Sequence, residues 1–196
     1  MNSKRGRLVT FIRRYAAVAA VILLLVVSGL VYFIQPGQYT NERLFKMYYK
    51  TEDAVGISRS GNGNIVEAIM KYHEKDYFTA LRLFDDILKN DPTNYAIRYY
   101  CGISYIETGS YENAVAMLES VMEQNENLYI EYAQWYCSLA YLAKGDQDSA
   151  KAGFKAIADN SDHYYKDQAS SILIKMEEGA DGKNFLKKVL FFILPF

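Results

Sequence analysis

The sequence predicts an all-α chain in which an N-terminal transmembrane helix is followed by a solenoid of three helix–turn–helix repeats and a capping helix. Three observations support this fold class: a long uncharged run near the N-terminus, a repeat with a period of 34 to 36 residues, and apolar stripes with helical spacing inside each repeat. The chain has 196 residues, and its 3 prolines and 12 glycines exclude a disordered or collagen-like protein.

The first elements are a basic tail over residues 1–14 and a transmembrane helix over residues 15–34. The tail carries five Lys and Arg residues and no acid, and the following 20 residues carry no charge. A helix of about 20 residues spans about 30 Å, which is the thickness of the hydrocarbon core of a bilayer. Because basic residues precede the span, we expect the tail to lie in the cytoplasm.

Two other interpretations of residues 15–34 stay open: a cleaved signal peptide and a buried helix of a soluble domain. The apolar core of a signal peptide is about 7–15 residues long, which is shorter than this run, so a retained signal anchor is favoured. A lipoprotein is excluded because no Cys lies near this end. The formal net charge of −1 then divides into +5 on the tail and −6 on the rest.

A linker with a short helix is expected over residues 35–63. Pro36-Gly37 ends the membrane helix, Asn41 caps a short helix, and Gly61-Asn62-Gly63 marks a loop.

Three repeats are expected over residues 64–163. Their anchor alanines, Ala80, Ala114 and Ala150, are 34 and 36 residues apart. Small residues let two helices approach closely, aromatic residues fill the space above them, and glycines allow the turns between antiparallel helices. The predicted repeat-packing residues are Ala68, Ala80, Phe84, Gly102, Tyr105, Ala114, Tyr141, Ala150 and Phe154.

This arrangement resembles the tetratricopeptide repeat (TPR) family over roughly half of the chain, with Pro92 closing the first repeat where the family usually has a proline. The resemblance implies a curved solenoid whose first helices line a peptide-binding groove. Carried over by position, the groove candidates are Ile69, Tyr72, Tyr99, Ile103, Tyr132, Trp135 and Leu139. Both groove contact and packing between helices stay open for Tyr99, Tyr132 and Trp135, whereas packing is favoured for Tyr105 and Tyr141.

The C-terminal region is predicted to hold a capping helix over residues 164–179 and an apolar tail over residues 180–196. Ala169, Ile172, Leu173 and Met176 form the inner stripe of the helix, and Gly179 is expected to end it. The run Val189–Leu194 is too short to span a bilayer. Insertion in the membrane interface, occupation of the groove, dimerisation and packing on the capping helix all stay open for the tail.

No arrangement of residues typical of catalysis, cofactor binding or metal binding is recognised, so we expect no enzyme, no cofactor and no metal site. His73 and His163 are 90 residues apart in the sequence. Asp85-Asp86 fits a solvated helix face. Cys101 and Cys137 occupy the same repeat position, and equivalent positions on packed helices lie about 8–10 Å apart, so two buried free thiols are expected.

The function expected from this resemblance is a membrane-anchored TPR scaffold that mediates protein–protein interactions at the outer face of the bacterial inner membrane. The chain is expected to be single-pass, with its TPR domain in the periplasm. Its short tail, single span and aromatic linker look like those of some bacterial TPR proteins in secretion, envelope assembly or signalling complexes. The partner is expected to be a protein or peptide, without nucleic acid or small-molecule substrate. The alternative is a transmembrane regulator whose basic tail contacts a cytoplasmic transcription factor.

Overall fold

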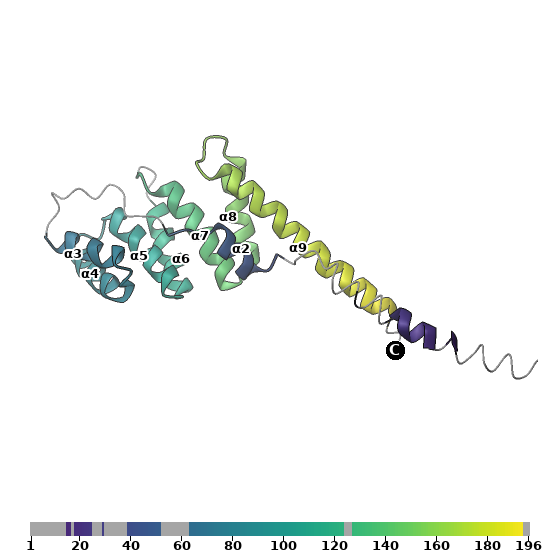
Figure 1. The fold of residues 1–196 in the computed structure, drawn as a ribbon. Coiled ribbons are helices and arrows are strands. Elements are labelled where there is room, and N and C mark those ends of the chain that lie inside the picture. Colours follow the sequence, from purple (N-terminus) through teal and green to yellow (C-terminus); the bar gives the residue numbers. More distant parts are fainter. Residues whose placement is uncertain are drawn as a thin grey trace, which may run out of the picture. The chain divides into compact units, whose positions relative to one another are not determined.

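The computed structural model describes residues 15, 16, 18–24, 29, 39–51, 63–123 and 127–193, with side chains described as far as Gly179. All regular structure in these residues is helical, as predicted (Figure 1). The chain divides into two units: residues 39–180, and a second unit made of residues 1–38 and 181–196. The first of these units holds the predicted repeats and most of the described structure.

The predicted transmembrane helix lies largely outside the described residues. Those of its residues that the structure describes, 15, 16, 18–24 and 29, are helical. Within the described part of the chain, no helix is both long enough and apolar enough to cross a membrane. The basic tail over residues 1–14 and most of the linker before Gly63 also lie outside the described residues.

The solenoid consists of three antiparallel helix pairs followed by α9. The pairs are α3 (Gly63–His73) with α4 (Tyr77–Asn90), α5 (Tyr95–Glu107) with α6 (Tyr111–Met122), and α7 (Ile130–Lys144) with α8 (Gln147–Asp159). Each of these helices packs mainly on the helices next to it in the sequence. The prediction that consecutive helix–turn–helix units build the fold is therefore confirmed for the described residues.

The turns inside the three pairs have the same backbone geometry although their residues differ. Gly109 and Gly145 have φ angles of 74° and 93°, and Lys75 adopts φ 61° at the matching place in the first pair. A left-handed conformation costs glycine little but costs other residues about 1–2 kcal/mol. The first turn therefore carries local strain that the other two avoid.

Side-chain caps start three of the helices: α4 and α8 just after such turns, and α5 after the loop that joins the first two pairs. Asp76, Asn94 and Asp146 accept hydrogen bonds from the backbone N–H groups of Thr79, Ile97 and Ser149. These bonds satisfy N–H groups that have no partner inside the helix. The bonds from Thr79 and Ser149 also hold the pKa values of Asp76 and Asp146 below their ordinary range.

Close helix packing within each pair depends on small residues at the crossing points. A Cβ on Gly102 of α5 would lie 2.6 Å from Cγ of Leu118 on α6, so any larger residue there would force the Leu118 side chain to shift. Ala68, Ala80, Ala114 and Ala150 are fully buried. Phe84 and Phe154 are fully buried too, and each such ring stabilises the fold by roughly 1.5–3 kcal/mol relative to an exposed one.

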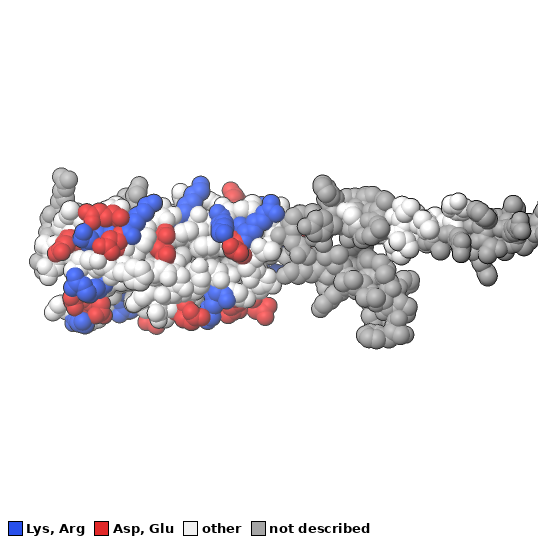
Figure 2. Space-filling model, turned by 60° about the horizontal axis from the view of Figure 1, so that its bottom comes forward, with Lys and Arg blue, Asp and Glu red and all other residues white. Residues whose placement is uncertain are grey.

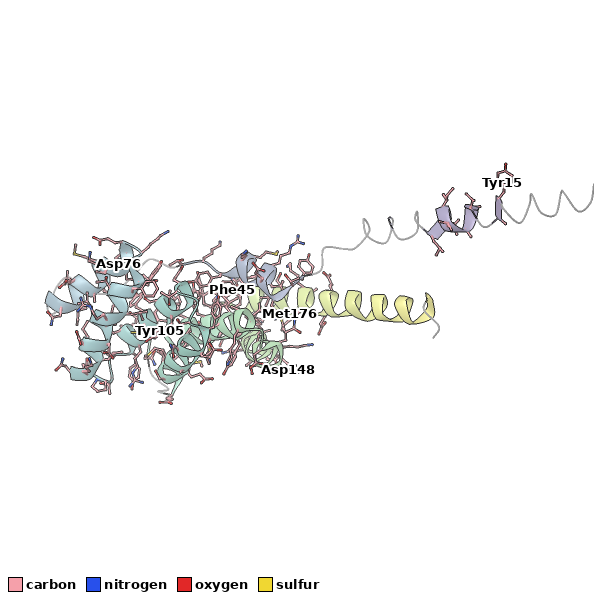
Figure 3. The ribbon with its side chains drawn as sticks, turned by 90° about the horizontal axis from the view of Figure 1, so that it is seen from below. Tyr15, Phe45, Asp76, Tyr105, Asp148 and Met176 are labelled. Carbon is pink, nitrogen blue, oxygen red and sulfur yellow. The ribbon has the colours of Figure 1, made fainter. Side chains whose placement is uncertain are left out.

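The short helix α2 (Asn41–Tyr48) does not pack beside α3, the helix that follows it in the sequence. It packs on α7, and Figure 1 shows it beside the third helix pair. Thr40 caps it by accepting a hydrogen bond from Arg43 N–H, one residue before the predicted cap, Asn41. In Figure 3, Phe45 of α2 lies among the side chains of the solenoid, and Asp76 marks the opposite end.

The last helix, α9 (Lys166–Ile193), differs from the prediction, because it continues through Gly179 instead of ending there. A helix that ends at glycine usually needs a positive φ, which Gly179 does not have. This glycine serves a close contact, since a Cβ there would lie 3.0 Å from the carbonyl oxygen of Tyr39. The predicted inner stripe is present, with Ala169 and Ile172 buried and Leu173 and Met176 half-buried.

Candidate functional site

The seven predicted groove residues lie on the first helices of the three pairs, but they do not line an open groove. Six of them have an exposed fraction of 9% or less, and only Tyr132 is half-buried. The buried six are Ile69 and Tyr72 of α3, Tyr99 and Ile103 of α5, and Trp135 and Leu139 of α7. The structure thus places these six in the core, where Tyr72 packs against Tyr77 and Tyr100 and Trp135 packs against Phe154 and Tyr165.

The chain's own residues 39–51 cover part of this surface. Tyr48 packs edge-on against Trp135, with ring centroids 6.2 Å apart, and Tyr49 packs edge-on against Tyr136 at 5.8 Å. The hydroxyl group of Tyr136 donates a 2.7 Å hydrogen bond to the carbonyl oxygen of Lys50. The segment therefore runs from α7 towards α5 as a short helix with an extended end, in the way that a bound peptide occupies a groove.

Glu107, the last residue of α5, holds the extended end of this segment. Its carboxylate oxygen Oε1 accepts a 2.8 Å hydrogen bond from Tyr49 Oη and a short hydrogen bond from Thr51 Oγ1. Burial, followed by the charge of Glu107, raises the pKa of Tyr49 above its ordinary value, so this phenol stays a hydrogen-bond donor. Two donors on one carboxylate fix the register of residues 49–51 along α5.

The other edge of the segment is attached to α9. The hydroxyl group of Tyr48 lies 2.8 Å from Ser171 Oγ and accepts a 2.7 Å hydrogen bond from Lys175 Nζ. At the start of the segment, the backbone of Tyr39 contacts Gly179. Residues 39–51 are therefore held by α5, α7 and α9 together, although they precede all three in the sequence.

The predicted residue roles outside this surface can also be placed. Cys101 and Cys137 are buried free thiols, and burial raises the pKa of each to about 12. Asp85 and Asp86 both pair with Lys89 on an exposed helix face.

Within the described residues, no group of three or more His, Cys, Asp or Glu side chains is placed to hold a metal ion. On the face in view, Figure 2 shows charges of both signs interspersed rather than a patch of one sign.

His163 has a structural role in the turn before α9. Its Nδ1 accepts a 3.0 Å hydrogen bond from the backbone N–H of Tyr165, and its Nε2 lies 3.0 Å from Gln134 Oε1. Because Nδ1 accepts, the neutral ring carries its proton on Nε2 and donates it to Gln134. Burial lowers the pKa of His163, and the charge of Glu131 opposes this shift.

Sequence reasoning missed the docked segment and its partner Glu107. One signal was present in the linker: Leu44, Phe45, Tyr48 and Tyr49 recur at the spacing of one apolar helix face. That pattern shows that a short helix has a face to bury, but it does not identify the surface that covers it.

Comparison with known families adds one finding. Residues 71–136, which include the second helix pair and parts of its neighbours, match a family model described as tetratricopeptide repeat. The comparisons with curated proteins and with solved structures returned no significant match.

Proposed function

Because residues 71–136 match the tetratricopeptide repeat family model, we propose that this chain is a protein-interaction scaffold held at a membrane by residues 15–34. TPR domains bind protein partners, which supports the first half of this proposal. The second half is supported by the 20 uncharged residues of the N-terminal segment. We place the TPR domain at the outer face of the bacterial inner membrane, in a secretion, envelope-assembly or signalling complex.

The observation that carries the proposal is the docking of residues 39–51 on α5, α7 and α9. These residues follow the uncharged segment almost directly. A solenoid on a free linker samples many orientations, whereas one that holds the chain close to its anchor stays near the membrane surface. Docking therefore suits a scaffold joined to its anchor segment by a short stretch of chain.

Cysteine labelling in cells tests the membrane arrangement. Cys101 and Cys137 are buried, and their raised pKa values leave almost no thiolate at neutral pH, so an introduced cysteine is labelled selectively. With the outer membrane permeabilised, a membrane-impermeant maleimide should label Asp85→Cys on the exposed face of α4. Ser3→Cys on the basic tail should react only after the inner membrane is opened. Equal labelling of both variants contradicts the arrangement.

Photo-crosslinking tests the scaffold function. Phe78, Leu128 and Tyr164 are large apolar residues with exposed fractions of 77%, 90% and 68%, so they are suitable positions for a crosslinking amino acid. One defined partner should be captured from at least one of these positions in membranes, and the fully buried Phe84 serves as the matched control. A set of products that does not differ from that of the Phe84 control argues against a specific partner.

A second candidate function, regulation across the membrane, draws on the same docking. If the basic tail contacts a cytoplasmic transcription factor, the docked segment provides a short connection from the solenoid to that tail. Deletion of residues 2–12 retains Arg13 and Arg14 and so preserves the orientation signal. Loss of the transcriptional response with normal insertion favours the regulator, and an unchanged response favours the scaffold. Neither function assigns a reaction to the chain.

A further inference from the structure

We propose that the surface of α5 and α7 beneath residues 39–51 is a peptide-binding site that the chain's own segment keeps closed. The external ligand is a segment of a partner protein with the same pattern: a short amphipathic helix that ends in two adjacent aromatic residues. This inference rests on the proposed function, because it identifies the surface by which the scaffold takes up its partner.

The site and the segment that covers it are separable. Glu107, Trp135 and Tyr136 belong to α5 and α7, which are held in place by α6 and α8. In a solenoid, each helix pair is stabilised mainly by its neighbours in the chain. The site therefore keeps its shape when residues 39–51 leave it.

The covering segment places one side chain, Leu44, in the hydrophobic core and packs Phe45, Tyr48 and Tyr49 against it. Among the residues of α2 only Leu44 is buried, and Glu42, Lys46 and Met47 remain exposed. Isolated helices shorter than about 12–15 residues are marginal in water, so the eight residues of α2 are helical only while they are docked. The segment thus has two states, docked and helical or released and unfolded.

The contacts define the chemistry of a competing ligand. Its helix must present aromatic side chains to Trp135 and Tyr136, and its extended end must offer hydroxyl donors to Glu107 and a carbonyl acceptor to Tyr136 Oη. An acidic residue at the position of Tyr49 is rejected, because it would face the Glu107 carboxylate with like charge. A partner must also overcome the high effective concentration of the tethered segment.

Trp135 provides a reporter for this competition, because it is the one tryptophan in the chain and contacts Tyr48 directly. The test uses the full chain in detergent with Tyr48→Ala and Tyr49→Ala, which weaken the segment and leave the site intact. A synthetic peptide of residues 39–51 should produce a saturable change in Trp135 fluorescence in this variant. The unmodified chain should bind it at least tenfold more weakly, and a peptide with the same two alanines should not bind.

Equal binding of the peptide by both chains, or no binding by a variant that keeps its helix content, overturns the proposal. If the variant with Tyr48→Ala and Tyr49→Ala fails to fold, a second measurement replaces it. A protease site is introduced within residues 52–62 of the otherwise unmodified chain, and the folded protein is cut at that site. The labelled peptide should then exchange into the cut chain at least tenfold more readily than into the uncut one, and equal exchange also overturns the proposal. Both readouts are independent of membrane topology and of cellular partners. A failure of this proposal can therefore be distinguished from a failure of the proposed function.

Discussion

Trp135 of α7 and Tyr165, the residue just before α9, lie face to face, with ring centroids 4.9 Å apart and 4° between the ring planes. Tyr48 of the docked segment meets the edge of the same indole ring. One buried ring thus connects the third helix pair to the last helix and to residues 39–51. Because this ring is buried among several elements, its loss should affect the stability of the fold.

Truncation of this ring should destabilise the fold. Trp135 has an exposed fraction of 2%, so Trp135→Ala should lower the free energy of unfolding by about 3–5 kcal/mol. Urea denaturation followed by circular dichroism measures this change. Tyr164→Ala is the matched control, because Tyr164 is exposed and its loss should change stability by no more than about 0.5 kcal/mol. Near-native stability of Trp135→Ala would show that this ring contributes little to the packing of the fold.

The strained turn of the first helix pair offers a stabilising change. Lys75 has a positive φ, so Lys75→Gly should stabilise the fold by about 0.5 kcal/mol, because the relief of strain exceeds the added entropy of the unfolded chain. Gly109→Ala at the equivalent position should destabilise it by about 1 kcal/mol. Thermal melts of the two variants should therefore shift in opposite directions. A lower melting temperature for Lys75→Gly contradicts the strain argument.

The contact between Gly102 and Leu118 should show coupling between two helices. Gly102→Ala places a methyl group against the Leu118 side chain, and overpacking of this kind costs about 1–3 kcal/mol. Leu118→Ala removes the obstructing atoms, so the double variant should be more stable than the sum of the single effects predicts. A double-mutant cycle by denaturant unfolding measures the difference. Strict additivity would show that α5 and α6 can move apart at this crossing.

The stability of the turn before α9 should depend on pH through His163. Burial lowers the pKa of this ring below its ordinary value of 6.5, so below about pH 6.5 the unfolded chain binds more protons than the folded chain. The contribution of His163 is therefore fully present above pH 6.5 and is lost as the pH falls through its folded pKa. Protonation also removes the acceptor for Tyr165 N–H.

Unfolding measured from pH 7.5 to pH 5 should thus show a loss of stability that His163→Gln reduces. His73→Gln, a substitution at an exposed residue of α3, is the matched control. An identical profile for all three proteins would assign the pH dependence to other groups.

Local patterns in the sequence were sufficient to predict the repeat architecture. The spacing of Ala80, Ala114 and Ala150 indicated consecutive helix pairs, and Gly109 and Gly145 indicated their turns. These features depend on residues within one helix or one turn, where periodicity and backbone freedom determine the conformation. The membrane segment, the basic tail and the role of the apolar tail remain predictions.

The tertiary structure decided how the segments far apart in the chain meet. Lys50 and Tyr136 are 86 residues apart and share a hydrogen bond, and Tyr48 reaches Ser171 across 123 residues. No local period encodes such contacts, because their geometry depends on how three helix pairs stack. The same stacking buries Trp135 and makes Gly179 a contact point within α9. The sequence alone determined which helices form, and only their packing decided which surface residues 39–51 cover.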